Sequence, residues 1–102
     1  MAQRIIWSPD AADDLEQIVK FIRRDSPRYA AGVATEVIEV IEDASVFPRA
    51  GRIVPEFDDE LLRERRVFNY RIIYRIDQEA IHIAAIIHGA RDLRQALGTR
   101  TI

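Results

Sequence analysis

The residues best suited to chemistry in this chain are a run of arginines followed by a histidine. Residues 63–75 hold five arginines and a single glutamate, and a histidine opens the later segment His88-Gly89-Ala90-Arg91. An arginine guanidinium makes paired hydrogen bonds to phosphate or carboxylate, and a histidine can move protons near neutral pH. This combination permits anion binding, with proton transfer if the histidine lies beside an arginine. The five arginines are Arg63, Arg65, Arg66, Arg71 and Arg75.

Three strands are predicted to position these side chains. Apolar residues recur with a period near two over 62–68, 70–76 and 80–88, and Asp77-Gln78-Glu79 is a polar hairpin tip between the last two. A two-residue or a four-residue loop at this tip gives the same pairing, with 76 opposite 81, 74 opposite 83 and 72 opposite 85. Both loops therefore predict the same two faces for the hairpin.

The predicted register places the candidate residues together. It puts Arg71, Arg75 and His88 on one face, where Arg63 and Arg65 of the neighbouring strand can join them. The opposite face is apolar and suits a layer of helices. Two other interpretations of these residues stay open, because arginines on a strand commonly form a solvated surface and His88 at a strand end can simply bond nearby backbone.

Two helices are predicted between a first strand at 4–8 and these later strands. Ser8-Pro9-Asp10 and Asp25-Ser26-Pro27 each offer a capping hydroxyl followed by proline, the signature of a helix start. The first helix must end before Pro27 and the second before Pro48, which gives a tightly joined helical hairpin. The acidic residues after Pro9 are interpreted as helix-start electrostatics.

The remaining segments complete an α+β domain. An extended piece at 52–55 and a short terminal helix at 91–97, ended by Gly98, are predicted. The expected architecture over residues 1–102 is one domain: an N-terminal strand, a helical hairpin packed on one face of a small antiparallel sheet, and a short C-terminal helix. The second sheet face is expected to be uncovered.

Composition limits the classes of function. The 102 residues include no cysteine and two histidines, which argues against disulfides, a metal site or a cofactor held by thiolates. No apolar run is long enough to span a membrane, and the start does not resemble a signal peptide, so a cytoplasmic protein is expected. The net charge of −2 argues against general nucleic-acid binding, although residues 63–75 form a locally basic face.

Several short segments occur along the chain in a specific order and spacing. They are Trp7-Ser8-Pro9, Phe47-Pro48, Gly51-Arg52-Ile53-Val54-Pro55-Glu56, Arg63-Glu64, Tyr70-Arg71-Ile72-Ile73-Tyr74-Arg75 and His88-Gly89-Ala90-Arg91. Together they resemble the RelE/ParE superfamily of type II toxins. The resemblance covers about residues 4–93 and implies a toxin that is neutralised by a cognate antitoxin in a hetero-oligomer.

The superfamily implies two activities. RelE-like members cut messenger RNA on the ribosome, and by resemblance Arg71 would hold the phosphate, Glu56 would act as a base and His88 would transfer a proton. ParE-like members inhibit DNA gyrase without chemistry of their own. The Gly51-to-Glu56 segment and the His88-Gly89 ending look more like the ParE branch, so gyrase inhibition is predicted, with a ribosome-dependent RNase or a non-toxic binding module as alternatives. The predicted target contacts are Arg63, Arg65, Arg71, Arg75, Arg91, Leu93 and Leu97.

Overall fold

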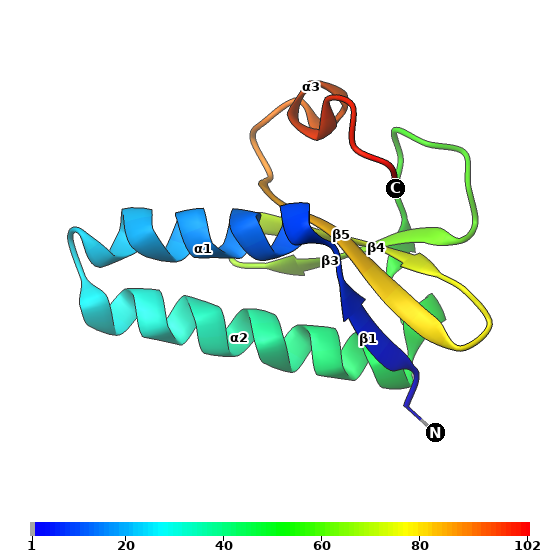
Figure 1. Ribbon diagram of the computed structural model, residues 1–102, viewed down its shortest axis with the longest axis horizontal. Helices are drawn as coiled ribbons and strands as arrows, with labels where there is room; N and C mark the ends of the chain where they lie inside the picture. The colour runs from blue at the N-terminus through cyan, green and yellow to red at the C-terminus, as the bar shows by residue number, and fades with distance from the viewer. Residues whose placement is uncertain (1) are drawn as a thin grey trace.

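The computed structural model describes residues 2–102 and confirms the predicted order of elements (Figure 1). No helix in this range is long and apolar enough to cross a membrane. The elements are β1 (Arg4–Trp7), α1 (Pro9–Arg23), α2 (Pro27–Val46), the 3-10 helix η1 (Pro48–Ala50), β2 (Arg52–Ile53), β3 (Leu62–Val67), β4 (Tyr70–Ile76), β5 (Ala80–His88) and α3 (Leu93–Leu97).

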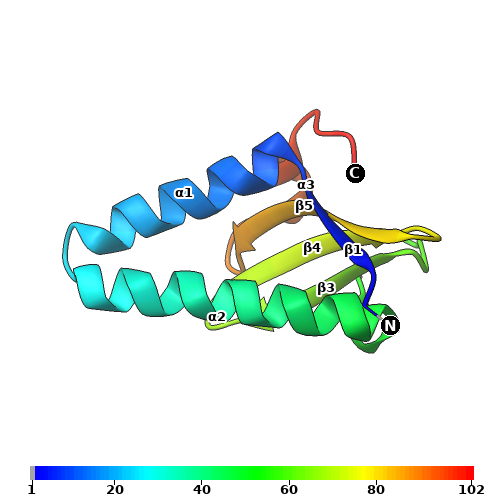
Figure 2. The same ribbon diagram turned by 60° about the horizontal axis from the view of Figure 1, so that its bottom comes forward.

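Serine caps start both long helices where the sequence predicts. The Ser8 hydroxyl oxygen accepts the Ala11 N–H at 3.0 Å, and the Ser26 hydroxyl oxygen accepts the Tyr29 N–H at 3.1 Å. Proline follows each cap in the first turn, where its missing N–H costs no hydrogen bond. The two helices lie side by side as one layer (Figure 2).

The sheet has the order β1-β5-β4-β3-β2 and is mixed rather than purely antiparallel. Strands β2 to β5 pair antiparallel as predicted, but β1 runs parallel to β5. The prediction misses this pair because β1 has no hairpin partner. Strand β1 pairs with the free edge of β5 in the direction that lets the chain pass directly into α1.

Both faces of the sheet carry a core. One face packs against α1 and α2 and is called the helix face; its buried residues include Val37, Ile41, Ile72 and Tyr74. The opposite face, called the α3 face, packs against the terminal helix (Figure 1). The expectation that this second face is uncovered is therefore wrong. Its buried residues are Val54, Leu62, Ile73, Ala84, Ala85, Ile87, Leu93 and Leu97.

A β-bulge changes the register in the middle of the last hairpin. Ile76 pairs with Ile81 and Tyr74 with Ile83, as predicted, but the register shifts between Ile73 and Tyr74. Ile72 consequently lies opposite Ile86 rather than residue 85. Because the side-chain period of a strand is two, one inserted residue moves everything beyond it on β5 to the other face.

Candidate functional site

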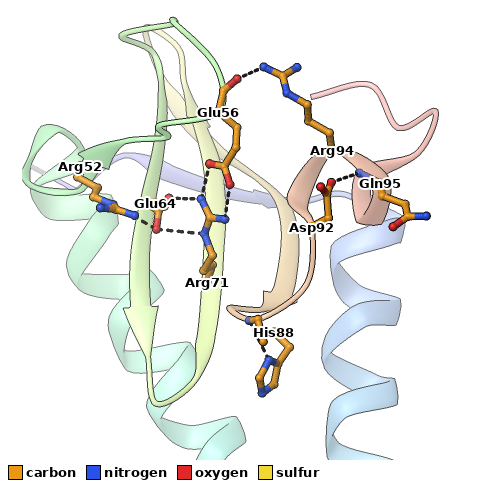
Figure 3. Close-up of polar contacts among 9 residues, drawn as sticks. Arg52, Glu56, Glu64, Arg71, His88, Asp92, Arg94 and Gln95 are labelled. Carbon is orange, nitrogen blue, oxygen red and sulfur yellow. Dashed lines mark hydrogen bonds and ion pairs between the residues drawn. The ribbon is translucent and has the colours of Figure 1, made fainter.

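Arg71 lies at the centre of a buried charge cluster on the α3 face (Figure 3). Arg71 is only 4% exposed, and its guanidinium donates hydrogen bonds to two carboxylates. Nη1 and Nη2 donate to the two oxygens of Glu56, both at 2.8 Å. Nη2 and Nε donate to Glu64 at 2.5 Å and 3.2 Å. Since a guanidinium has five N–H groups, only one, on Nη1, has no partner in this cluster.

Strand pairing and one turn bring these charges together. Glu64 on β3 pairs with Arg52 of β2, and the Arg52 Nε lies 3.4 Å from Glu64 Oε2. Glu64 is 2% exposed, so its carboxylate depends on the two arginines for solvation. Glu56 reaches Arg71 from the turn that follows β2, where the Phe57 N–H donates to the Val54 carbonyl. Together, residues of β2, β3, β4 and the 54–57 turn form the charge cluster Arg52, Glu56, Glu64 and Arg71.

The cluster fixes the ionisation of its members. Hydrogen bonds from Arg71 lower the pKa of Glu56 to about 2, against a smaller opposing effect of burial. The same hydrogen bonds, with those to Glu64, raise the pKa of Arg71. Both groups are therefore charged at neutral pH, and Glu56 is a very weak base.

Acid is expected to weaken the fold through Glu56. The folded pKa near 2 lies below the ordinary value of 4.5, so the ion pair stabilises the protein fully above pH 4.5 and is lost as the pH falls toward 2. Denaturant unfolding of wild type and Glu56→Gln between pH 7 and pH 2.5 measures this contribution. The stability difference between the two proteins should shrink as the pH falls, and a constant difference would contradict the assignment.

The terminal helix is tied to the same cluster. The Arg94 Nη2 donates to the backbone carbonyl of Glu56, and the Arg94 guanidinium stacks over the Phe57 ring at 4.5 Å from its centroid. Asp92 caps α3 by accepting the Gln95 N–H at 2.9 Å (Figure 3). Leu93 and Leu97 are 1% and 5% exposed. The prediction that Leu93 and Leu97 contact the target does not fit this structure, because both side chains fill the core between α3 and the sheet.

His88 does not join Arg71, so the prediction that they share a face is wrong. The bulge places His88 opposite Tyr70 on the helix face, and the two rings meet edge to face at 5.5 Å. The His88 Nδ1 accepts the Ala90 N–H at 3.1 Å, which is the backbone bonding considered above. In Figure 3 the His88 ring points away from the charge cluster.

The other predicted arginines have mainly structural partners. Arg63 donates to the carbonyls of Glu60, Arg49 and Gly51 at 2.6 to 3.1 Å. Arg65 pairs with Asp43 of α2. Both lie on the helix face, away from Arg71, because Val67 pairs with Tyr70 and sets the opposite alternation along β3.

Arg75 and Arg91 are the remaining arginines among the predicted target contacts. Arg75 lies on the α3 face, as predicted, and pairs with Asp59 at 2.9 Å. Arg91 is exposed in the segment before α3 and forms no ion pair with any residue in 2–102. Arg63 also forms no ion pair in residues 2–102, but its guanidinium is bound to three backbone carbonyls.

Asp14 has a role that the sequence does not reveal. Its carboxylate accepts the Ile86 N–H at 2.9 Å and two hydrogen bonds from Arg100, both at 2.7 Å. It therefore joins α1, the bulged part of β5 and the C-terminal tail. No spacing signal connects residues this far apart. Within residues 2–102, no group of three or more His, Cys, Asp or Glu side chains is arranged to hold a metal ion.

Comparison with known proteins relates the chain to a family of toxins. Residues 5–93 match the family model described as ParE toxin of type II toxin-antitoxin system, parDE. No curated protein matches the sequence. A chain of the chromosomal ParDE toxin-antitoxin system from P. aeruginosa superimposes with a TM-score of 0.70 at 18% identity, over 85% of this chain and 96% of that one.

Two further solved structures have the same fold. A chain of the toxin-antitoxin complex RelBE2 from Mycobacterium tuberculosis gives a TM-score of 0.60 at 24% identity, over 86% of this chain and 99% of that one. The YoeB/ParE toxin from Agrobacterium tumefaciens gives 0.62 at 20% identity, over 83% and 96%. These similarities establish the α+β toxin fold, and the family match covers most of the chain.

Proposed function

The chain belongs to the ParE toxin family of type II toxin-antitoxin systems, and from this premise we propose that it acts in the cytoplasm by binding and inhibiting DNA gyrase. A cognate antitoxin neutralises it by forming a hetero-oligomer. The toxin needs no cofactor, because its action is binding rather than catalysis. Arg91, exposed and without an ion-pair partner in residues 2–102, is retained as a contact with the target.

The observation that carries this proposal is the closed state of the Arg71 charge cluster. Cleavage of RNA needs a free cation for the phosphate and an acid–base pair near the reacting hydroxyl. Arg71 is instead buried and neutralised by Glu56 and Glu64. Glu56, with its pKa near 2, cannot accept a proton efficiently at neutral pH, and His88 lies on the other face of the sheet. The contacts within the cluster support a structural role for Arg71 rather than a catalytic one, which favours gyrase inhibition over RNA cleavage.

The test compares two purified systems. The protein is expected to block supercoiling of relaxed plasmid by gyrase or to trap cleaved DNA, and to leave messenger RNA intact in a translation reaction. Glu56→Gln should inhibit gyrase as wild type does when assayed at neutral pH. Messenger cleavage that Glu56→Gln abolishes would instead establish the RNase activity. Absence of both effects, with normal growth on expression without antitoxin, would identify a non-toxic binding module.

A further inference from the structure

Four rings gather where β3 turns into β4, beside the start of α2. The Tyr29 and Phe68 rings meet edge to face with centroids 6.1 Å apart, and Tyr70 meets His88 in the same manner at 5.5 Å. Burial raises the pKa of the Tyr70 phenol, and the Tyr29 phenol adds to this rise. The Gly89 N–H donates to the Asn69 carbonyl at 2.6 Å and holds the end of β5 against the turn. We call Tyr29, Phe68, Tyr70 and His88 the turn aromatic surface.

Phe68 occupies this surface in a backbone conformation that disfavours it. Its φ is +52°, and it is the one non-glycine residue with positive φ in residues 2–102. In the two-residue loop between Val67 and Tyr70, positive φ at the first central residue alone matches a type II′ turn, where glycine is strongly favoured. Phe68 is also 55% exposed, so burial does not compensate for the strain. Backbone strain that is not offset by burial of the side chain points to a function for the Phe68 ring.

An unpaired cation borders the surface. Arg28 adjoins Tyr29 in the first turn of α2. Arg66 lies at the same end of the sheet but on the α3 face, because it pairs with Arg71, and its guanidinium is 3.0 Å from where a Gly89 side chain would begin. Neither arginine forms an ion pair with any residue in 2–102. Exposed aromatic rings and arginines are the residues that dominate binding energy at protein interfaces. The charge of this rim complements carboxylates on a partner.

We propose that the turn aromatic surface, with Arg28 at its rim, is where the toxin binds its target protein. This inference rests on the proposed function and assigns the surface to a segment of gyrase that presents an apolar side chain flanked by carboxylates. A protein partner fits better than single-stranded nucleic acid. The rings pack edge to face in pairs rather than as a stacking platform, and the chain carries a net charge of −2.

Phe68→Gly tests the surface without endangering the fold. Glycine adopts positive φ freely, so thermal unfolding should occur at the wild-type temperature or above it. Inhibition of gyrase supercoiling should nevertheless weaken by at least about tenfold, a loss typical of an interface anchor. Arg28→Glu should weaken inhibition in the same way. It should not destabilise α2, because a negative side chain interacts favourably with the positive N-terminus of the helix. Phe47→Ala is the matched control, because Phe47 is 58% exposed at the far end of α2.

Each outcome has a defined meaning. Wild-type protein that leaves gyrase unaffected would overturn the proposed function and this inference with it. An active wild type with an equally active, folded Phe68→Gly would overturn the surface alone. Weakened binding of Phe68→Gly to a labelled single-stranded oligonucleotide, or to the cognate antitoxin, with gyrase inhibition intact, would assign the surface to that other ligand and overturn the gyrase contact. Loss of inhibition in Phe68→Gly and Arg28→Glu but not in Phe47→Ala would support it.

Discussion

Replacing Arg71 with alanine is expected to lower the free energy of unfolding by about 3–5 kcal/mol, a large part of the stability of a small domain. The substitution removes the guanidinium that joins Glu56 on the turn to Glu64 on β3. Glu56 can move toward solvent, since its side chain is 32% exposed. Glu64, with its side chain 1% exposed, would remain a buried carboxylate with only Arg52 at 3.4 Å to compensate it. Urea denaturation followed by circular dichroism measures the loss.

The double replacement Arg71→Met with Glu64→Leu is the informative control. It removes both buried charges and fills the space with apolar atoms, which typically restores stability to near the original value. The single substitutions Arg71→Met and Glu64→Leu form with this double a cycle whose coupling energy reports the ion pair itself. If Arg71→Ala costs less than about 1 kcal/mol, Glu64 is solvated in some other way and the cluster is not the structural element described above.

Local signals were sufficient to predict the helical half of the fold. A serine cap and a proline define each helix start within one or two residues, because the hydrogen bonds that satisfy the first turn come from the adjoining residue. The strand order along the chain follows from the change of period after Gly51. These features depend on neighbours in sequence, and the structure confirms them at Ser8 and Ser26.

The faces of the later strands could not be predicted in the same way. A bulge adds one residue to β5 without any glycine or proline to mark it, so His88 moves to the face opposite Arg71. The two-residue loop at Phe68 is equally hidden, because its residues do not include the glycine that such turns favour. Arg63 and Arg65 consequently lie on the helix face rather than beside Arg71.

The candidate site depends on contacts between distant segments. The sequence identifies Arg71 and Glu56 as candidate residues, but it does not show that they bind each other and Glu64. In the sequence, Glu64 on β3 is simply the single acidic residue of a basic segment. Its burial follows only from strand pairing. Asp14 likewise looks like a helix-start charge, although it holds Ile86 and Arg100. A charged residue whose partner is distant in sequence carries no local mark of its role.

Gly51→Ala is expected to destabilise the protein by about 1–3 kcal/mol or more through overpacking. Gly51 has an ordinary φ of −69°, so the penalty comes from space rather than backbone conformation. An added methyl group would overlap the Tyr74 hydroxyl oxygen and come within 2.8 Å of the Glu64 carbonyl oxygen. Tyr74 is fully buried and its hydroxyl donates to the Pro48 carbonyl at 2.6 Å, so it cannot move aside without losing that bond.

Gly32→Ala provides the matched control for this prediction. Gly32 lies inside α2, and apart from its chain neighbours and the backbone of its own helix turn no atom lies within 4 Å of the added methyl group, so alanine should stabilise the helix by about 0.5–1 kcal/mol. Thermal unfolding should therefore shift in opposite directions for the two variants. Gly51→Ala should also speed hydrogen exchange at the Val54 amide, which donates to the Leu62 carbonyl at 3.1 Å, because the clash pushes β2 away from β3. Equal unfolding temperatures would mean that the space around Gly51 relaxes, and Arg52 and Glu56 would then be held to the charge cluster less rigidly than their contacts indicate.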